Sequence, residues 1–251
     1  MLLLSPQLEA VRADEIEWAV YQRIGRFEFF IEYPENAPGL AAELDSVAAE
    51  LQQQVGLAQP ADGVQVIIFR TAESYRAYLK PRIPEGVSRR AIYYREGDMH
   101  QIYAYRSTQL ITDLRHEFTH AYLHQQLPYV PLWVDEGLAE YFEERPAARQ
   151  RSSRLTAMKW RCRTGQTPRL RNLEQLADAQ SMTSGHYRDS WAWIYFLLTE
   201  SDQSRTLLSQ YLQAISAGEA PGSFTSFEVN RQLQVTNRMG SYFRRFRFSL
   251  R

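Results

Sequence analysis

The stretch "STQLITDLRHEFTHAYLHQQLP", residues 107–128, decides how the rest of the chain is interpreted, because it holds two histidines at helical spacing. His116 and His120 lie four residues apart, so ~400° of helical turn places both imidazoles on one face, about one turn apart. Two such rings can bind one metal ion, and Glu117 beside them can reach a water on that ion. The spacing is the H-E-x-x-H arrangement, in which the glutamate acts as a general base.

The same stretch predicts the limits of the helix. Ser107 is a candidate N-cap, and Pro128 disfavours helical backbone in the residue before it. Leu110, Leu114 and Ala121 give the helix an apolar side. We therefore expect one amphipathic helix with its apolar side against a core and its histidines on another side.

Two imidazoles are too few for a catalytic zinc ion, which normally takes three protein ligands and keeps one position for water. His124 is close, but the pattern with a third histidine is H-E-x-x-H-x-x-G-x-x-H, and this chain has Gln126 at that place. We expect His124 to be exposed, or to contact a ligand without binding the metal itself.

A better third ligand lies downstream, in "VPLWVDEGLAEYFEERP", residues 130–146. The spacing predicts a helix with Pro131 in its first turn and Pro146 at its far end. Glu136 and Glu140 are four apart and project together, which is unfavourable unless a cation lies beside them. Glu136 can bind the metal, and Glu140 can accept the N–H of a ligand histidine and fix its tautomer.

In this combination the sequence resembles the gluzincin metallopeptidases, the peptidase MA-like proteins. "HEFTH" and "LWVDEGLAEYFE" match the paired motifs of that group, and the likeness is greatest to small bacterial domains of unassigned substrate. The resemblance implies one Zn²⁺ held by His116, His120 and Glu136, with Glu117 as general base and Glu140 behind the ligands. It also implies an α+β, zincin-like fold and the hydrolysis of polypeptides.

A third segment, "GHYRDSWAWIYFLLTE", residues 185–200, resembles the part of gluzincin aminopeptidases whose tyrosine donates to the oxyanion. The resemblance implies this role for Tyr187. Asp189 and Ser190 replace the Lys-Gly of that segment, and His186 remains a rival donor. The Gly-Ala-Met-Glu-Asn stretch that holds a free amine in aminopeptidases is also replaced, which argues against aminopeptidase activity.

The first hundred residues have the pattern of α/β structure, and the remainder reads as helical. We expect a 1–125 α/β lobe that ends in the HEFTH helix and a 126–251 helical lobe with Glu136 and Tyr187, in a single domain.

Within the first lobe, Thr71 is a cap candidate without a full capping box. "HQIYAYR", residues 100–106, is the expected strand for binding an extended substrate. The other expected segments are strands at 26–33, 63–70 and 91–95, helices at 38–56, 71–79 and 224–248, and loops at 81–88 and 148–155.

Composition narrows the function further. Lys plus Arg equals Asp plus Glu, 29 each, so no overall charge favours nucleic acid. The lone Cys162 forms no internal disulfide. Residues 1–15 lack the pattern of a signal peptide, and no window resembles a membrane span. The sequence therefore indicates a soluble protein, although a leader peptide that had been removed would leave no trace in this sequence.

Two functions remain after this reading. The first is a zinc peptidase that uses a metal-activated water. The second is an inactive zinc-binding relative that acts as a protein-interaction module, for which the base at Glu117 would be unnecessary.

Overall fold

The computed structural model describes residues 16–60, 63–231 and 233–245. The predictions for residues 1–15, and the end of the helix expected to reach residue 248, lie outside these residues. In the described part, every helix is too short or too polar to cross a membrane.

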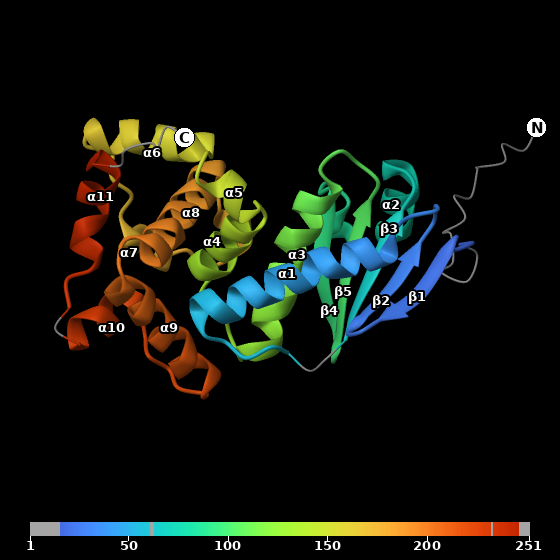
Figure 1. Cartoon of the computed structure of the whole chain (residues 1–251), viewed down its shortest axis with the longest axis horizontal. Coiled ribbons are helices and arrows are strands. Elements are labelled where there is room, and N and C mark those ends of the chain that lie inside the picture. The colour runs from blue at the N-terminus through green and yellow to red at the C-terminus, as the bar shows by residue number, and fades with distance from the viewer. Residues whose placement is uncertain (1–15, 61–62, 232, 246–251) are drawn as a thin grey trace, which may run out of the picture.

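One mixed sheet of five strands forms in the N-terminal half of the chain (Figure 1). The strands are β1 (Val20–Ile24), β2 (Phe27–Ile31), β3 (Val64–Phe69), β4 (Ala91–Glu96) and β5 (Met99–Tyr105). They lie in the order β1-β2-β3-β5-β4. The central strands β2, β3 and β5 are parallel, and β1 and β4 run antiparallel at the two edges. The predicted strands are confirmed, whereas β1 was not expected.

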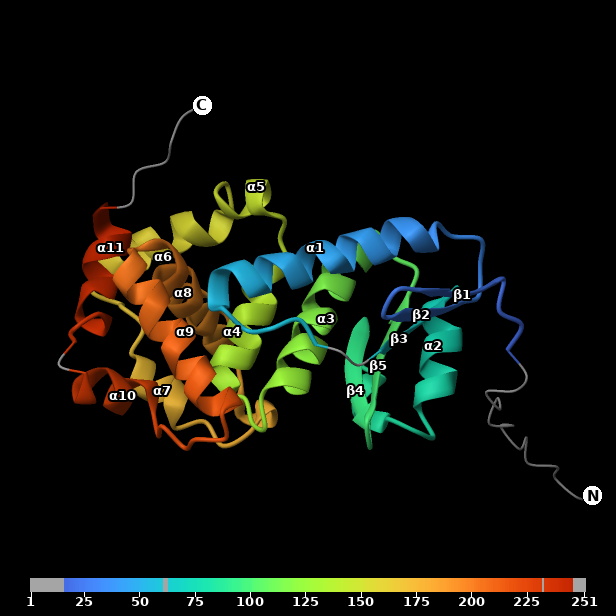
Figure 2. The ribbon, with the colours of Figure 1, turned by 60° about the horizontal axis from the view of Figure 1, so that its bottom comes forward.

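Three helices cover the two faces of this sheet, as Figure 2 shows. They are α1 (Ala37–Val55), α2 (Ala72–Leu79) and α3 (Leu110–Gln126). Successive side chains of a strand point to opposite faces, so Val66 and Ile68 of β3 join the core beneath α1 and α3. Ile67 and Phe69 belong to a second cluster, which α2 covers. The apolar run of β3 is therefore buried on both sides.

The second half of the chain is helical and lies beside the sheet half, with α1 running along both (Figures 1 and 2). Its helices are α4 (Leu132–Phe142), α5 (Pro146–Arg149), α6 (Ser153–Arg163), α7 (Leu170–Glu174), α8 (Ser184–Thr199), α9 (Asp202–Ser216), α10 (Phe224–Asn230) and α11 (Met239–Arg245). Short 3-10 turns occur at η2 (Pro84–Gly86), η3 (Ala179–Ser181) and η4 (Thr236–Arg238). The α+β class is confirmed, while the division into lobes at residue 125 stays a prediction.

Several local predictions were wrong. The hydroxyl of Ser107 accepts the N–H of Gln109 in a turn, and α3 begins only at Leu110. Thr71 does form a reciprocal capping box, because the serine hydroxyl at Ser74 performs the part usually played by a longer side chain. The loop predicted at 148–155 is reduced to residues 150–152 between α5 and α6.

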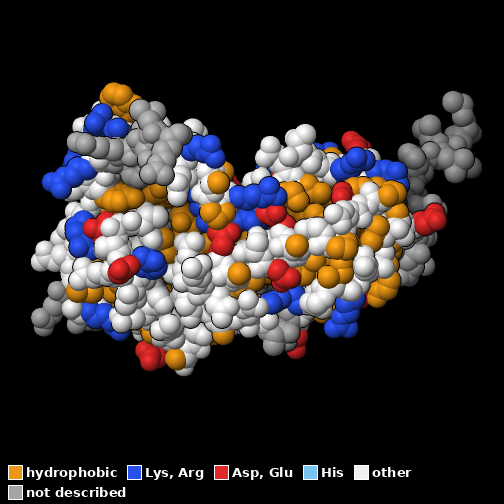
Figure 3. Space-filling model, in the orientation of Figure 1, with side chains coloured by type: hydrophobic (Ala, Val, Ile, Leu, Met, Phe, Trp, Pro, Cys, Tyr) orange, Lys and Arg blue, Asp and Glu red, His pale blue; other side chains and the backbone are white. Residues whose placement is uncertain are grey.

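A network of ion pairs fixes α3 against α1. Arg115 is only 1% exposed, and its guanidinium lies 2.7 Å from the carboxylate of Glu43 and 3.1 Å from that of Glu50. Its Nε also donates to the carbonyl of Phe142 at the end of α4. Figure 3 shows acidic and basic side chains together where the surface is hollowed between the two halves. Because Arg115 precedes His116, this network holds the face of α3 that carries His116 and His120 in a fixed orientation.

Helices α4 and α8 pack closely at Gly137, the residue after Glu136. A methyl group placed on Gly137 would lie 2.8 Å from the carbonyl oxygen of Ser190 and 2.6 Å from the side chain of Ile194. Both distances are shorter than normal contacts between such atoms. The glycine therefore sets how near α8 comes to the helix that carries Glu136.

We expect Gly137→Ala to destabilise the protein by about 2 kcal/mol, since overpacking costs ~1–3 kcal/mol and better helix propensity returns at most ~1 kcal/mol. Urea unfolding measures the change. Gly185→Ala, in the first turn of α8, is the matched control because the added methyl would make only ordinary contacts at 3.4 Å. Equal stability of the two variants would contradict the close α4–α8 contact.

Candidate metal centre

Helix α3 turns its apolar side toward the sheet and presents its histidines to α4. Phe118 packs edge-on against Phe27 of β2, with ring centroids 5.3 Å apart. The rings of His116 and His120 lie one turn apart, with centroids separated by 5.0 Å. Both contact carboxylates of α4 and of the residue that follows it.

Glu136 of α4 faces both histidines. Its Oε2 lies 3.8 Å from Nε2 of His116 and 3.8 Å from Nε2 of His120. This oxygen is buried and has no hydrogen-bond partner among the described residues. Burial raises the pKa of Glu136, although the two histidines oppose the shift. An unpaired buried acceptor is unfavourable by ~1–3 kcal/mol, so the position is suited to a cation.

These three side chains form a group that could hold a metal ion. Bonds of ~2.0–2.1 Å in tetrahedral geometry place ligand atoms ~3.4 Å apart, and the observed 3.8 Å separations require only a small contraction. Two imidazole nitrogens and one carboxylate oxygen are donors that zinc accepts, whereas calcium and magnesium prefer oxygen ligands. The side chain of His116 is 17% exposed, whereas those of His120 and Glu136 are 9% and 7% exposed.

Two further carboxylates orient the histidines. Nδ1 of His116 lies 3.0 Å from Oε2 of Glu143, and Nδ1 of His120 lies 2.7 Å from Oδ1 of Asp135. Each Nδ1–H donates to an ionised carboxylate, so Nε2 is the ring nitrogen directed toward Glu136, and its lone pair is available to a metal once its proton has left. The sequence missed both acids, although Glu143 lies seven residues after Glu136 and hence on the same side of the helix.

The charges of this cluster shift its pKa values. Burial by itself would lower the pKa of His120, but the charge and hydrogen bond of Asp135 raise it to about 10. Burial likewise opposes ionisation of Asp135, yet the charge of His120 lowers the pKa of this carboxyl. Burial opposes ionisation of Glu143, but the hydrogen bond and charge of His116, together with those of Arg154, lower the pKa of this carboxyl. In the metal-free protein a proton therefore competes for the site of the metal.

Glu140 occupies a different place from the one expected. Its carboxylate lies 2.8 Å from the guanidinium of Arg154, which also contacts Glu143 at 2.7 Å. The partner of the His116 ring is Glu143 rather than Glu140. Glu140 remains near His116, since the two can share a metal-sized space with Glu143. Arg154 neutralises two of the acids crowded behind the histidines.

We expect zinc affinity of the wild-type chain to rise with pH between ~7 and ~10, because the metal must displace the proton of His120. In Asp135→Asn that dependence should flatten above the ordinary histidine pKa of ~6.5. At pH 9 the variant should bind zinc more weakly, by ~10–100-fold, since its ligand ring is no longer oriented. Competition with a chelator measures both effects. Asp98→Asn, whose side chain is fully exposed, should follow the wild type, and a shared slope in all three proteins would exclude this role.

His124 lies behind the site. Its Nε2 is 3.0 Å from Oδ2 of Asp135, whose other oxygen accepts from His120. These three side chains form a second group with metal-binding spacing. However, their nitrogen–oxygen distances are those of hydrogen bonds, with the protons between the heavy atoms. His124 thus supports Asp135, which is the indirect contact that the sequence allowed for it.

Glu117 lies between α3 and the edge of the sheet. It is 7% exposed, and its Oε2 accepts the backbone N–H of Tyr93 at 2.7 Å. Tyr93 belongs to β4, so the free edge beside the site is β4. The expectation that residues 100–106 would form this edge is wrong, because β5 pairs on one side with β3 and on the other with β4.

Tyr187 and His186 lie in the first turn of α8, and their side chains have different surroundings. Burial raises the pKa of Tyr187, and so does the charge of Glu136, while a hydrogen bond from Arg89 opposes the shift. The ring of His186 instead accepts the N–H of Thr183 and caps its own helix. The structure therefore brings Tyr187 toward Glu136 and holds His186 in the cap.

Comparison with models of known protein families gives no match for this chain, and comparison with curated proteins gives none either. The resemblance therefore rests on the motifs themselves. The structure adds Asp135, Glu143, Arg154 and the N–H of Tyr93 to the residues that sequence reasoning identified. The acidic residues were visible in the sequence, but the strand contact depends on tertiary packing.

Proposed function

We propose that the protein is a zinc-dependent peptidase with a zincin-like arrangement of its site. The observation that carries the proposal is the buried, unpartnered Oε2 of Glu136, equidistant from two histidine Nε2 atoms. His116, His120 and Glu136 would hold the ion. When bound there, zinc supplies Lewis-acid chemistry that polarises a carbonyl group and lowers the pKa of water toward ~7.

The remaining steps use side chains of this chain. Glu117 removes a proton from the attacking water, whose oxygen adds to the scissile carbonyl carbon. As the C–N bond breaks, the same carboxyl delivers its proton to the leaving amine. The N–H of Tyr93 keeps the Glu117 carboxylate oriented, and the hydroxyl of Tyr187 donates to the oxyanion.

The edge strand supplies the binding surface for substrate. Strand β4 has β5 on one side only, so an extended peptide could add along its other side through main-chain hydrogen bonds. Its Tyr93 lies within hydrogen-bond distance of Glu117. A peptide bond bound along this strand would therefore lie next to the general base.

Two measurements on the purified protein test the proposal. Metal analysis should give about one zinc per chain, as a three-ligand site requires, and a library of quenched fluorescent peptides should contain substrates that it cleaves. Removal of zinc with a chelator should abolish cleavage, and added zinc should restore it. Bound zinc with no cleavage of any peptide would favour the inactive zinc-binding relative, and absence of bound divalent metal would overturn both.

A further inference from the structure

A large cavity lies in the helical half, apart from the metal group. Its volume is about 870 Å³, and its walls come from α7, α8, α10 and the segment around η4. Trp193 of α8 lines it, six residues after Tyr187 and hence ~9 Å further along the helix axis. None of the three proposed metal ligands lines this cavity.

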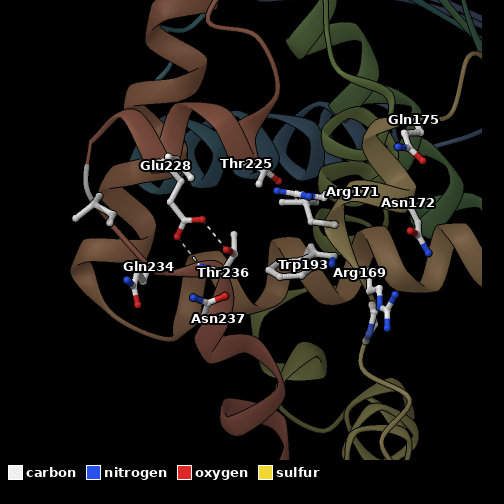
Figure 4. Close-up of a pocket in the computed structure, with 14 residues that line it drawn as sticks. Arg169, Arg171, Asn172, Gln175, Trp193, Thr225, Glu228, Gln234, Thr236 and Asn237 are labelled. Atoms are coloured by element: carbon white, nitrogen blue, oxygen red, sulfur yellow. Dashed lines mark hydrogen bonds between the residues drawn. The ribbon is translucent and has the colours of Figure 1, made fainter.

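One wall carries two unpaired positive charges. Arg169 and Arg171 flank Leu170, whose burial with Leu173 anchors α7 to the core. Both arginines line the cavity, and Figure 4 shows Arg171 above the ring of Trp193 and Arg169 near the nitrogen-bearing end of that ring. In the described part of the chain, no acidic side chain forms an ion pair with either arginine. Both arginines are exposed, and the anchoring of α7 fixes the backbone positions from which they extend.

The acids near the cavity already have other partners. Glu228 is 2% exposed, and its two oxygens accept the N–H and the hydroxyl of Thr236, as Figure 4 shows. Glu174 accepts the N–H and the hydroxyl of Thr225 in the same manner. These bonds hold the opposite walls together and leave the arginines available to a ligand.

The floor of the cavity contains another unused donor. Trp193 is 3% exposed, and its indole N–H is buried without an acceptor among the described residues. Figure 4 shows the nitrogen-bearing end of the ring directed toward the side of Arg169. Buried polar groups normally have partners, so this donor, in a cavity that two arginines also line, points to an acceptor that is negatively charged. Val229 and Leu233 add apolar surface to the same cavity.

We infer that this cavity binds an organic anion, with its carboxylate or phosphate group held by Arg169 and Arg171 and its apolar part against Val229 and Leu233. Guanidinium groups bind both kinds of anion through paired hydrogen bonds. The cavity has the size of an ordinary small-molecule site. This inference does not depend on the proposed peptidase activity.

The test follows the indole N–H signal of Trp193 by NMR in the full-length protein. The chain has five tryptophans, and Trp193→Phe assigns the signal. Phenyl phosphate and benzoate serve as probes, with benzamide as the neutral counterpart and inorganic phosphate as the anion without an apolar part. We expect a saturable shift with one or both organic anions, weaker binding of inorganic phosphate and no saturable shift with benzamide. The better of the two organic anions identifies the preferred head group.

The double variant Arg169→Gln/Arg171→Gln should bind the same probe at least ~10-fold more weakly, because charge-assisted pairs are lost. Arg23→Gln/Arg76→Gln is the matched control, since it removes two exposed arginines that lie outside the cavity. Unchanged indole signals from the other tryptophans would show that the variants are folded. Equal affinity in both double variants, equal binding of benzamide, or no saturable shift with either organic anion would overturn the inference.

Discussion

Replacing Glu117 with glutamine should abolish peptide hydrolysis while leaving zinc bound. Loss of a general base lowers turnover by ~10²–10⁴-fold. Glutamine has the same shape, and its carbonyl oxygen can still accept the N–H of Tyr93, the contact that Oε2 makes at 2.7 Å. The fold and the three metal ligands should therefore be preserved. Steady-state kinetics on the best library peptide, with zinc content measured on the same sample, gives both results.

Glu85→Gln is the matched control for this experiment, because Glu85 is an exposed residue of η2. The control should retain wild-type turnover. Wild-type turnover in Glu117→Gln would mean that another group removes the proton. Loss of zinc from Glu117→Gln would instead mean that the substitution disturbs the ligands. Glu117→Asp would then separate the effect of side-chain length from the effect of charge.

Glu136→Ala should lose zinc and, with it, all stabilisation by zinc. A ligand that binds only the folded state at 1,000 times its dissociation constant contributes ~4 kcal/mol. The variant should lose this contribution, because two imidazoles alone form a weak site. In the absence of metal the variant should be no less stable than the wild type, since the substitution removes a buried oxygen without a partner. Melting temperatures with and without zinc measure both effects.

His124→Ala distinguishes the proposed metal group from the group that contains His124. If zinc binds to His116, His120 and Glu136, His124→Ala should retain the zinc-dependent rise in melting temperature. If zinc instead binds to His120, His124 and Asp135, which also have metal-binding spacing, the rise should disappear in His124→Ala and persist in Glu136→Ala. The second pattern would reject the proposed ligand set.

The close packing at Gly137 is expected to affect the candidate metal centre as well as the stability of the fold. Helix α8 approaches α4 closely enough at Ser190 to exclude a methyl group, and the same helix carries Tyr187 in its first turn. The close contact thus determines the separation between Glu136 and Tyr187. A larger residue at position 137 is expected to affect turnover as well as stability, even though it touches neither metal nor substrate.

Much of the fold was visible in the sequence because the signals are local. An aromatic run marked β2 and a β-branched run marked β3, and Gly56, which is in a left-handed conformation, marked the end of α1. The two strands expected at 91–95 and 100–106 are joined in the structure as a hairpin, with Gly97 at φ of 60° in the turn. The sequence did not show which hairpin strand would be the edge. Pairing of β5 with the distant β3 decides that point, and such pairing leaves no local pattern.

The sequence by itself determined that His116 and His120 share one face and that Glu117 lies beside them, because helical periodicity fixes the relation of residues within one turn. It could also nominate Glu136, but it could not distinguish the tasks of four neighbouring acids. Only the tertiary structure assigned Glu143 to the ring of His116, Asp135 to the ring of His120 and Glu140 to Arg154. Those assignments depend on how α4 is rotated and placed against α3, which is decided by contacts with α8 and by the ion pairs of Arg115 rather than by any spacing within α4.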